Sequence, residues 1–321
     1  MHLAISLNIA ATNGQDVLDF GQISAFVQKA EAAGVDMVII SDVLGSGEPS
    51  TSPFEATTLL AALATVTDRI GLVASASTLA HQPYNLARRF ASLDIISHGR
   101  IGWNATLSQN PREAANFSRP EGFSDDDFRR RAEEFIGIVH GLWRGWDADA
   151  LLFDKAGGRF HDPGKMHVLD HKGDFFAVRG PLNVARSPQD TPVLVMSGSS
   201  VADRDFASRV ADVILIEEQS AETANAASAH LRRRALAAGR KPEGVKVLLT
   251  VAVGSEPNVD RLRTLLGSSG CEGLHLTLPT GNQELQSFAD HILPEIRHRG
   301  LAGQGRPGAT LRAHLGLGGA K

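Results

Sequence analysis

Several apolar runs of the sequence end in residues that are mostly polar and uncharged. The residues at these run ends are Asn8, Asp42, Ser77 with Thr78, Asn104 with Thr106 and Ser108, Ser199 with Ser200, Glu217 with Gln219, and Pro279 with Thr280. Hydroxyl and amide groups of this kind suit the binding of a ring-shaped cofactor better than they suit acid–base catalysis. The pattern therefore predicts a ligand site with few fixed charges.

The segment Ser197-Gly198-Ser199-Ser200 stands between an apolar run and a helical pattern. Its glycine permits close approach of a ligand, and the first N–H groups of a helix together with serine hydroxyls can hold a phosphate. A capping turn, in which Ser200 pairs with Asp203, explains the same residues. Both interpretations stay open at this point.

Two other residues are candidates for contact with a polar ligand. Asp42 follows the apolar run 37–41, although a turn-forming aspartate explains it nearly as well. Asn104, in Gly102-Trp103-Asn104, pairs a flat aromatic ring with an amide, which suits a ring cofactor. Asp42 and Glu217 are also the kind of carboxylate pair that a glycosidase uses, provided that they lie close together in space.

Other catalytic patterns are weak or missing from the sequence. There is no Ser-His-Asp order, no Walker loop and no His-x-x-x-His helix. His161, His167 and His171 share one long loop, but their spacing is a weak signal of metal ligation. The single cysteine, Cys271, excludes an internal disulfide and a site built from several thiolates. We therefore predict no metal site.

The elements that must position these residues alternate between strand and helix. Eight apolar β-rich runs, separated by helical spacing, occupy residues 3–9, 35–41, 70–76, 100–105, 193–197, 213–217, 245–253 and 273–278. Alternating strands and helices imply a parallel sheet, and eight right-handed units close naturally into a (β/α)8 barrel. In such a barrel the site lies at the carboxyl ends of the strands, where the polar residues are found.

Helix starts and buried faces can be read from the sequence as well. Ser52-Pro53-Phe54-Glu55 predicts a helix capped by Ser52, and Ser124 followed by three aspartates predicts another helix start. One apolar face is predicted for each of two helices, formed by Leu86, Phe90, Leu93 and Ile96 in the first and by Phe128, Ala132, Phe135, Val139 and Leu142 in the second.

We predict a single barrel domain over residues 1–321, with residues 145–191 inserted between the fourth helix and the fifth strand as a lid or binding wall. A hairpin is expected around residues 171–174 of this insertion. By contrast, only residues 254–270 separate the last two strands, so this region is short. Phe117, Phe123 and Phe153, with Trp103, are candidates for apolar walls.

Composition limits the partners and the compartment. The 321 residues carry a net charge of −4 with a pI near 6.3, which gives no electrostatic footprint for nucleic acid or an anionic membrane. The first 15 residues do not resemble a secretory signal, and no apolar stretch approaches the roughly 18 residues of a membrane span. We expect a cytoplasmic protein that acts on a small molecule.

The stretch 85–104, NLARRFASLDIISHGRIGWN, resembles the signature of the luciferase-like flavin-dependent monooxygenases. It is most similar to the nitrilotriacetate and dibenzothiophene-sulfone monooxygenase branch. Other segments agree with this resemblance, which covers most of the chain from about residue 35; they are Asp154-Lys155, residues 160–165, residues 171–173, residues 178–183 and residues 310–317.

The resemblance implies a (β/α)8 barrel that binds FMN, supplied in reduced form by a separate NAD(P)H:flavin reductase, and that uses dioxygen to oxygenate a small organic substrate. Carried over by position, Asp42, Ser77 and Thr78 would line the flavin ring and its ribityl chain. Asn104 matches the asparagine near the flavin and is the catalytic candidate. Ser199 and Ser200 match the turn that grips the FMN phosphate. The superfamily also implies that subunits pair through helices beside the second and third strands.

Two departures from the family pattern bear on function. Asp125 and Arg129 stand where the family has a histidine and a tyrosine, and Arg129 could replace the phenol with a charge-assisted bond to the phosphate. Relatives carry a long insertion after the seventh strand, and its shortness here removes part of the rim. In a site open to water, the reaction of reduced flavin with dioxygen ends in hydrogen peroxide without oxygenating a substrate.

Three alternatives to the monooxygenase stay open at this stage. A flavin-binding barrel that has lost turnover would fit the short rim and the altered Asp125 and Arg129. A deazaflavin-dependent oxidoreductase needs a basic rim for an acidic cofactor tail, and the strand ends are nearly free of lysine and arginine. A glycoside hydrolase rests only on Asp42 and Glu217.

Overall fold

Eight parallel strands form a closed barrel in the structure of the chain, a computed structural model that describes residues 1–12, 17–42, 50–107, 114–117, 122–198, 200–253, 258–278, 281–301 and 309–318. In order around the ring the strands are β1 (His2–Asn8), β3 (Met37–Ser41), β5 (Gly71–Ser77), β6 (Ile101–Thr106), β11 (Val193–Ser197), β12 (Val213–Glu217), β13 (Lys246–Ala252) and β14 (Gly273–Thr277). All eight predicted strands are present, so the (β/α)8 barrel is confirmed.

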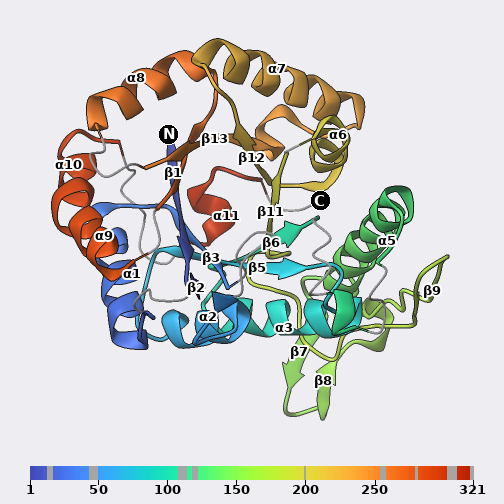
Figure 1. Ribbon diagram of the computed structural model, residues 1–321. Coiled ribbons are helices and arrows are strands. Elements are labelled where there is room, and N and C mark those ends of the chain that lie inside the picture. Colours follow the sequence, from blue (N-terminus) through green and yellow to red (C-terminus); the bar gives the residue numbers. More distant parts are fainter. Residues whose placement is uncertain are drawn as a thin grey trace.

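Helices surround the barrel, as Figure 1 shows. They are α1 (Phe20–Ala33), α2 (Ala56–Ala64), α3 (Pro83–Ile96), α5 (Asp125–Trp143), α6 (Val201–Val210), α7 (Ala221–Ala237), α8 (Val259–Ser269), α9 (Asn282–Ser287), a π-helical turn (Phe288–Ile292) and α10 (Leu293–His298). A short α11 (Leu311–His314) lies within the ring of strands (Figure 1).

The predicted helix starts are right in one case and wrong in the other. Ser124 caps α5, and its hydroxyl accepts a hydrogen bond from the Asp127 N–H at 3.2 Å. Ser52 does not cap α2, because that helix begins at Ala56 with Glu55 as the cap, which accepts from the Thr58 N–H at 2.7 Å. The proline at Pro53 therefore precedes the helix instead of opening it.

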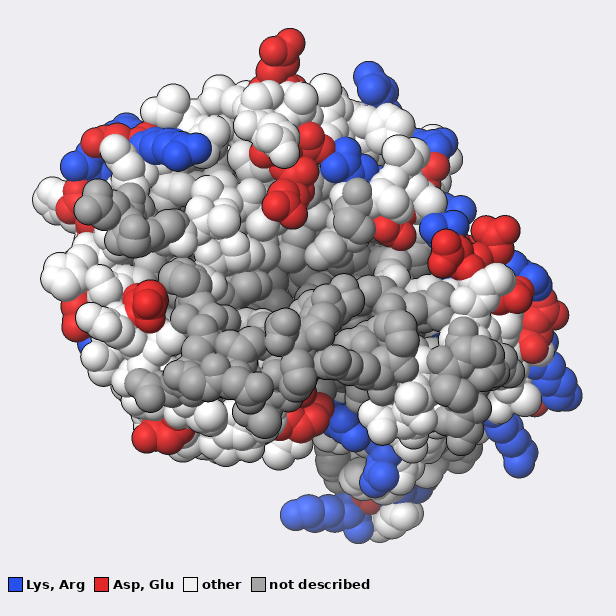
Figure 2. All heavy atoms as spheres, in the orientation of Figure 1, with Lys and Arg blue, Asp and Glu red and all other residues white. Residues whose placement is uncertain are grey.

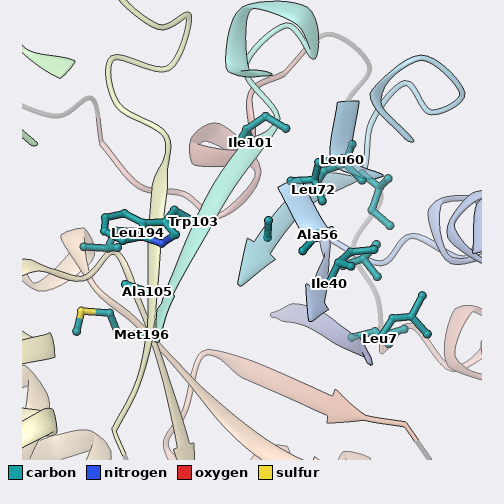
Figure 3. Packing of buried hydrophobic residues seen from close by; sticks show 14 of the residues in the cluster. Leu7, Ile40, Ala56, Leu60, Leu72, Ile101, Trp103, Ala105, Leu194 and Met196 are labelled. Atoms are coloured by element: carbon teal, nitrogen blue, oxygen red, sulfur yellow. The ribbon is translucent and has the colours of Figure 1, made fainter. Parts of the chain in front are cut away.

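The outward-facing strand residues pack against the helices, and Figure 3 shows part of this layer. Trp103 lies here, fully buried against Phe90 and Phe135, with its indole N–H donated to the Ala76 carbonyl at 3.0 Å. The expectation that Trp103 joins Asn104 at a ring cofactor is wrong, since successive strand residues point to opposite faces. The predicted apolar face of α5 is buried throughout, whereas Ile96 at the end of α3 is 51% exposed.

The amino-terminal half of the barrel interior is apolar. Inward-facing residues such as Met37, Val73 and Val193 pack there with Leu311 and Leu315 from the carboxyl-terminal segment. Leu311 is fully buried, and a Cβ added at Gly71 would lie 2.4 Å from its Cδ1, so this glycine makes room for the plug. The segment that includes α11 therefore closes this end of the barrel.

The insertion between α5 and β11 contains two antiparallel hairpins. The strands β7 (Leu151–Asp154) and β8 (Arg159–His161) form the first, and β9 (His171–Lys172) and β10 (Ala177–Val178) form the second, which confirms the hairpin expected around residues 171–174. The first hairpin projects from the ring in Figure 1, and Phe153 on it is 63% exposed, so Phe153 is not a wall of a site.

The region after the seventh strand is short, as predicted. The strand β13 ends at Ala252 and β14 begins at Gly273, and the helix α8 between them has 11 residues. Elsewhere, two short strands, β2 (Ala11–Thr12) and β4 (Ser50–Thr51), pair with each other outside the barrel sheet.

Candidate functional site

The carboxyl-terminal half of the barrel interior is polar. Strand alternation turns inward the residues Ser6, Asn8, Ser41, Ser75, Ser77, Asn104, Thr106, Ser197, Glu217, Thr250, His275 and Thr277. Hydroxyl and amide groups dominate this set. The strands thus collect the described members of the predicted strand-end set at one mouth of the barrel, where active sites of this fold lie. Ser108, Pro279 and Thr280 lie outside the described residues.

Asn104 lies on β6 with one polar atom satisfied and one unsatisfied. Its Nδ2 donates to the Ser75 hydroxyl on β5 at 2.9 Å, while its buried Oδ1 has no hydrogen-bond partner. Whichever way the amide is assigned, one of its two polar atoms is left unpaired. A buried polar atom without a partner costs free energy, so its presence points to a ligand that completes it.

The Ser77-Thr78 pair shows the same feature at the end of β5. The Ser77 hydroxyl accepts from the Leu79 N–H at 3.0 Å and so shapes the turn. Thr78 is fully buried, and its Oγ1 has no partner, although its carbonyl oxygen accepts a bond of 2.6 Å from Arg131 Nη1. The turn is therefore held rigidly with one hydroxyl left for a ligand.

Asp42 follows β3 and reaches the start of α2. Its Oδ2 accepts from the Ala56 N–H at 2.9 Å, and burial raises the pKa of this carboxyl despite that bond. The turn-type explanation for Asp42 thus has a definite contact, while its role toward a flavin stays a prediction. Glu217 lies on β12, four strands away around the ring of eight, so the two carboxylates stand on opposite sides of the barrel.

A cavity of about 330 Å³ brings together Asp125, Arg129 and Ser200, which the resemblance to the family had drawn attention to. Leu107, Phe128, Ala132 and Asp203 complete its lining. The Arg129 Nε is buried without a hydrogen-bond partner, and its Nη1 lies 3.9 Å from Asp126, too far for a hydrogen bond. A guanidinium with an unpaired N–H in a cavity suits an anion.

The turn before α6 is a capping box, as the simpler interpretation of the sequence predicted. The Ser200 hydroxyl accepts from the Asp203 N–H at 3.0 Å, and the Ser200 N–H donates to the Asp203 carboxylate at 3.2 Å. Ser200 therefore has its own partners, and Asp203 adds a negative charge to the cavity. Ser199, the other predicted phosphate contact, lies outside the described residues.

A second, larger cavity of about 610 Å³ lies beside the turn that follows Thr78. Its lining consists of Leu79, Ala80, His81, Gln82, Asn116, Phe117, Phe123, Arg131, Asp174, Phe175 and Phe176. Phe117 and Phe123 thus line a cavity, as expected. Sequence analysis missed Arg131, although its position on the apolar face of α5, three residues after Phe128, was a visible signal.

His275 is a buried histidine inside the polar half of the barrel, and it too was missed. Its Nε2 lies 2.6 Å from the Ser6 hydroxyl and its Nδ1 lies 3.0 Å from the Thr250 hydroxyl. Burial lowers the pKa of this imidazole to about 4. His275 is therefore neutral at physiological pH and holds three strands together through hydroxyl groups.

The histidines of the insertion lie in separate contacts. His171 bonds Glu134 at 2.9 Å and His167 bonds Asp147 at 3.0 Å, while the ring of His161 lies against Trp146. Within the described residues no group of three or more His, Cys, Asp or Glu side chains could hold a metal ion. Nor does any helix among them have the length and apolar character needed to cross a membrane.

The unsatisfied atoms provide a test of whether the site fits a flavin. In the described part of the chain, six buried side-chain nitrogen or oxygen atoms lack a hydrogen-bond partner, and three of them belong to Thr78, Asn104 and Arg129. All three residues are at positions predicted to contact the cofactor. A flavin mononucleotide carries ring N–H and carbonyl groups, ribityl hydroxyls and a phosphate, which can pair with these atoms, so the residues fit the group.

A family model for the luciferase-like monooxygenases matches residues 1–306. The chain belongs to this luciferase-like monooxygenase family. The family match, together with the closed barrel, supports the resemblance found in the stretch 85–104. The polar barrel mouth described above therefore belongs to a member of a flavin-dependent monooxygenase family.

Several relatives share substantial sequence with this luciferase-like chain. It is 42% identical over 223 residues to the N-acetyl-S-(2-succino)cysteine monooxygenase of Bacillus subtilis, which covers 68% of this chain and 51% of the relative. It is 41% identical over 247 residues to the nitrilotriacetate monooxygenase component A of Aminobacter aminovorans, which covers 76% and 54%. The chain thus spans about half the length of these curated relatives.

Solved structures confirm the fold of this family member. The EDTA monooxygenase of Chelativorans sp. BNC1 superposes with a TM-score of 0.84 at 24% identity, over 99% of each chain. A riboflavin lyase, crystallised with modified FMN and riboflavin, gives a TM-score of 0.85 at 24% identity, over 98% of this chain and 95% of that one. At this level of identity the likeness concerns the barrel fold alone.

Proposed function

We propose that this chain is an FMN-dependent two-component monooxygenase, which uses reduced FMN and dioxygen to oxygenate a small organic substrate. The observation that carries the proposal is the set of unpaired buried atoms at Thr78, Asn104 and Arg129. When bound, the reduced flavin supplies the electrons that activate dioxygen. The protein supplies binding, orientation and exclusion of water.

Asn104 and Thr78 act at the ring end of the proposed site. The Ser75 hydroxyl fixes the Asn104 amide, and Arg131 fixes the backbone at Thr78, so both polar groups are oriented before a ligand arrives. Groups that are already in position lose little freedom on binding, which favours affinity. We assign Asn104 the contact with the reacting ring, and Asp42 and Ser77 the supporting positions at the neighbouring strand ends.

Arg129 and the α6 turn act at the phosphate end. The Arg129 guanidinium gives a charge-assisted bond, and the first N–H groups of α6 add the partial positive charge of a helix start. Asp203 opposes this attraction, because its carboxylate lines the same cavity and occupies the Ser200 N–H. We therefore assign Arg129 the dominant phosphate contact, and Ser199 and Ser200 a lesser one.

A separate NAD(P)H:flavin reductase is proposed to supply the reduced FMN. Support comes from the relative named component A, a name that implies at least one further component. The test is to titrate the protein with FMN, and anaerobically with reduced FMN, and to follow the quenching of flavin fluorescence or the heat of binding. Saturable binding in the micromolar range is expected. No binding of either redox form contradicts the proposal.

A second candidate is a flavin-binding barrel that releases hydrogen peroxide without oxygenating a substrate. The short α8 region and the Asp203 carboxylate in the cavity favour it. The two candidates differ in the fate of oxygen. With a reductase and NADH present, a coupled enzyme given its substrate forms less peroxide than oxygen consumed, whereas an uncoupled barrel forms equal amounts whatever organic compound is added.

A further inference from the structure

The hairpin of β9 and β10 brings the residues of its turn to one wall of the 610 Å³ cavity. Phe175 and Phe176 of this turn line the cavity, together with Phe117, which is 47% exposed. The strands β9 and β10 have only two residues each, and the turn 173–176 joins them. A two-stranded hairpin of this size is not stable by itself in water, so other contacts must hold the wall in place.

The carboxylate of Glu134 on α5 holds the turn. Its Oε2 accepts from the Phe175 N–H at 3.1 Å, and its Oε1 accepts from the Phe176 N–H at 2.9 Å. Oε1 also lies 2.9 Å from His171 Nε2, which donates because a carboxylate only accepts. The side chain of Glu134 is 12% exposed, so these bonds are largely shielded from water. Hydrogen bonds to an ionised group are roughly twice as strong as those between neutral groups.

The aromatic rings of the turn pack partly on the same helix. The Phe176 ring meets the buried ring of Phe135 edge to face, with the centroids 5.7 Å apart. The Phe175 ring stands edge to face with Phe123 at 6.3 Å, and the Arg130 guanidinium lies 5.6 Å from its centroid. Phe135 and Arg130 belong to α5, so the helix that carries Glu134 anchors both rings.

The wall is also connected to the proposed flavin site. The Arg131 guanidinium lies 4.7 Å from the Phe176 centroid, and its Nη1 donates to the Thr78 carbonyl oxygen at 2.6 Å. Thr78 is one of the residues assigned to the flavin, and Leu79 directly after it lines the cavity. A ligand in the 610 Å³ cavity therefore lies next to the proposed flavin site.

We propose that Glu134 is a positioning residue, which holds the turn 173–176 so that Phe175 and Phe176 form a fixed wall for a flat apolar ligand. Aromatic rings pack edge to face or with offset stacking, and a wall that is already in position loses little freedom on binding. The assignment of this ligand as the organic substrate rests on the proposed monooxygenase function, whereas the holding of the wall does not.

Hydrogen exchange in the full chain tests the holding directly, because Glu134 binds the N–H groups of Phe175 and Phe176. In Glu134→Gln an amide N–H₂ replaces one acceptor, so both N–H groups should exchange about tenfold faster or more, while the barrel strands keep wild-type exchange. Glu133→Gln is the matched control, since Glu133 pairs with Arg209 instead. Equal exchange in the two variants overturns the proposal, and so does faster exchange throughout the barrel.

Gly173→Ala gives a second variant that leaves the carboxylate in the chain. A Cβ added at Gly173 would meet the Glu134 carboxylate and would lie 2.6 Å from His171 Nε2, so it should displace Glu134 and speed exchange at the turn. Gly137→Ala on α5 is its control, because a Cβ added there meets nothing within 4 Å. Wild-type exchange at the turn of the Gly173→Ala protein contradicts the role of Glu134.

Binding of prodan, an uncharged naphthalene dye whose emission rises and shifts to the blue in an apolar site, tests the wall itself. The wild-type chain should bind it saturably, and Phe175→Leu and Glu134→Gln should each weaken binding about two- to tenfold. Phe153→Leu, on the exposed β7–β8 hairpin, and Glu133→Gln should leave binding unchanged. No saturable binding by the wild type overturns the proposal, as does wild-type affinity of Glu134→Gln.

A double variant shows whether Glu134 acts through the aromatic wall. Glu134→Gln should weaken prodan binding less in the Phe175→Leu background than in the wild type, because part of the wall is already lost there. Equal losses in the two backgrounds would contradict action through the wall.

FMN titration of the same proteins separates this proposal from the proposed function. If FMN binds and prodan does not, only this proposal fails. If prodan binds with the expected pattern and FMN does not, Glu134 positions the wall as proposed, but the substrate role is overturned together with the proposed function. If FMN displaces prodan, the cavity belongs to the flavin site, which overturns the substrate role alone.

Discussion

The two halves of the barrel interior differ in what they hold. At the amino-terminal ends of the strands, Met37, Val73 and Val193 pack with Leu311 and Leu315 in a closed apolar cluster. At the carboxyl ends the interior is built from hydroxyls and amides, and Asn104 Oδ1 and Thr78 Oγ1 are left without partners. The amino-terminal half is a closed apolar cluster, whereas the carboxyl-terminal half has buried polar atoms that can still form hydrogen bonds.

The difference shows how one sheet divides stability from function. Every buried group of an apolar cluster stabilises the folded chain, so truncating any of them lowers the free energy of unfolding. An unpaired buried polar atom destabilises the folded chain by about 1–3 kcal/mol. Such atoms are expected at sites where a bound ligand pairs with them. Figure 2 shows the charged side chains of the described residues mainly around the periphery of the molecule on this face. Substitutions in the two halves should therefore affect different measurements.

The largest effect is expected from Leu311→Ala in the apolar half. Leu311 is fully buried against Gly71, so truncation leaves a cavity and should lower the free energy of unfolding by about 3 kcal/mol. Urea or thermal unfolding measures the loss. FMN affinity, measured well below the melting temperature, should not change. A loss of FMN affinity without a loss of unfolding free energy would contradict the division of the barrel into a stabilising half and a binding half.

The polar half should carry a pH-dependent part of the stability through His275. Its pKa in the folded chain is about 4, below the 6.5 of an ordinary histidine. As the pH falls from 6.5 to 4, His275 binds a proton in the unfolded chain but not in the folded chain. The free energy of unfolding therefore falls, by about 3 kcal/mol at most. His275→Gln should flatten the unfolding profile over this window. Parallel profiles for the two proteins would contradict the assignment.

Arg129→Gln should weaken FMN binding about tenfold, because a charge-assisted bond to the phosphate is lost. Riboflavin, which lacks the phosphate, should bind both proteins equally. Arg130→Gln serves as the control, since Arg130 neighbours Arg129 on α5 but pairs with Asp174. Equal loss of affinity for FMN and riboflavin would place Arg129 away from the phosphate.

A smaller change of opposite sign is expected for Asp203→Asn. Removing the carboxylate from the 330 Å³ cavity relieves repulsion of the phosphate, and FMN affinity should rise a few-fold, more at low salt than at high salt. Calorimetry at two ionic strengths measures it. Weaker FMN binding would show that the capping box of Ser200 and Asp203, and not the charge of Asp203, determines FMN affinity at this cavity.

Much of the fold could be predicted from the sequence because barrel strands are short and apolar and alternate with helices. The eight strands lie where the apolar runs predicted them, and Ser124 caps a helix as its aspartates indicated. Ser52 was misassigned because Glu55 offers an equally good capping oxygen three residues later. Trp103 was misplaced because adjacency in sequence was taken for adjacency in space, whereas a strand turns neighbours to opposite faces.

The site could be predicted only in part. Strand-end position was sufficient to collect Ser77, Asn104 and Thr78, since every strand end of a barrel meets at one mouth. The cavity shared by Arg129, Asp125 and Ser200 depends on how α5 packs beside α6, which no spacing in the sequence encodes. His275 was missed for a similar reason, because its partners Ser6 and Thr250 come from strands distant in the chain.

The most direct test of the central claim, that the polar half of the barrel binds a flavin, is an FMN titration of the wild-type and Asn104→Leu proteins, with urea unfolding of both. We expect saturable micromolar binding by the wild type and affinity lower by about tenfold or more in Asn104→Leu, with an unfolding midpoint that is unchanged or higher. Equal FMN affinity of the two proteins, or no binding by the wild type, would contradict it.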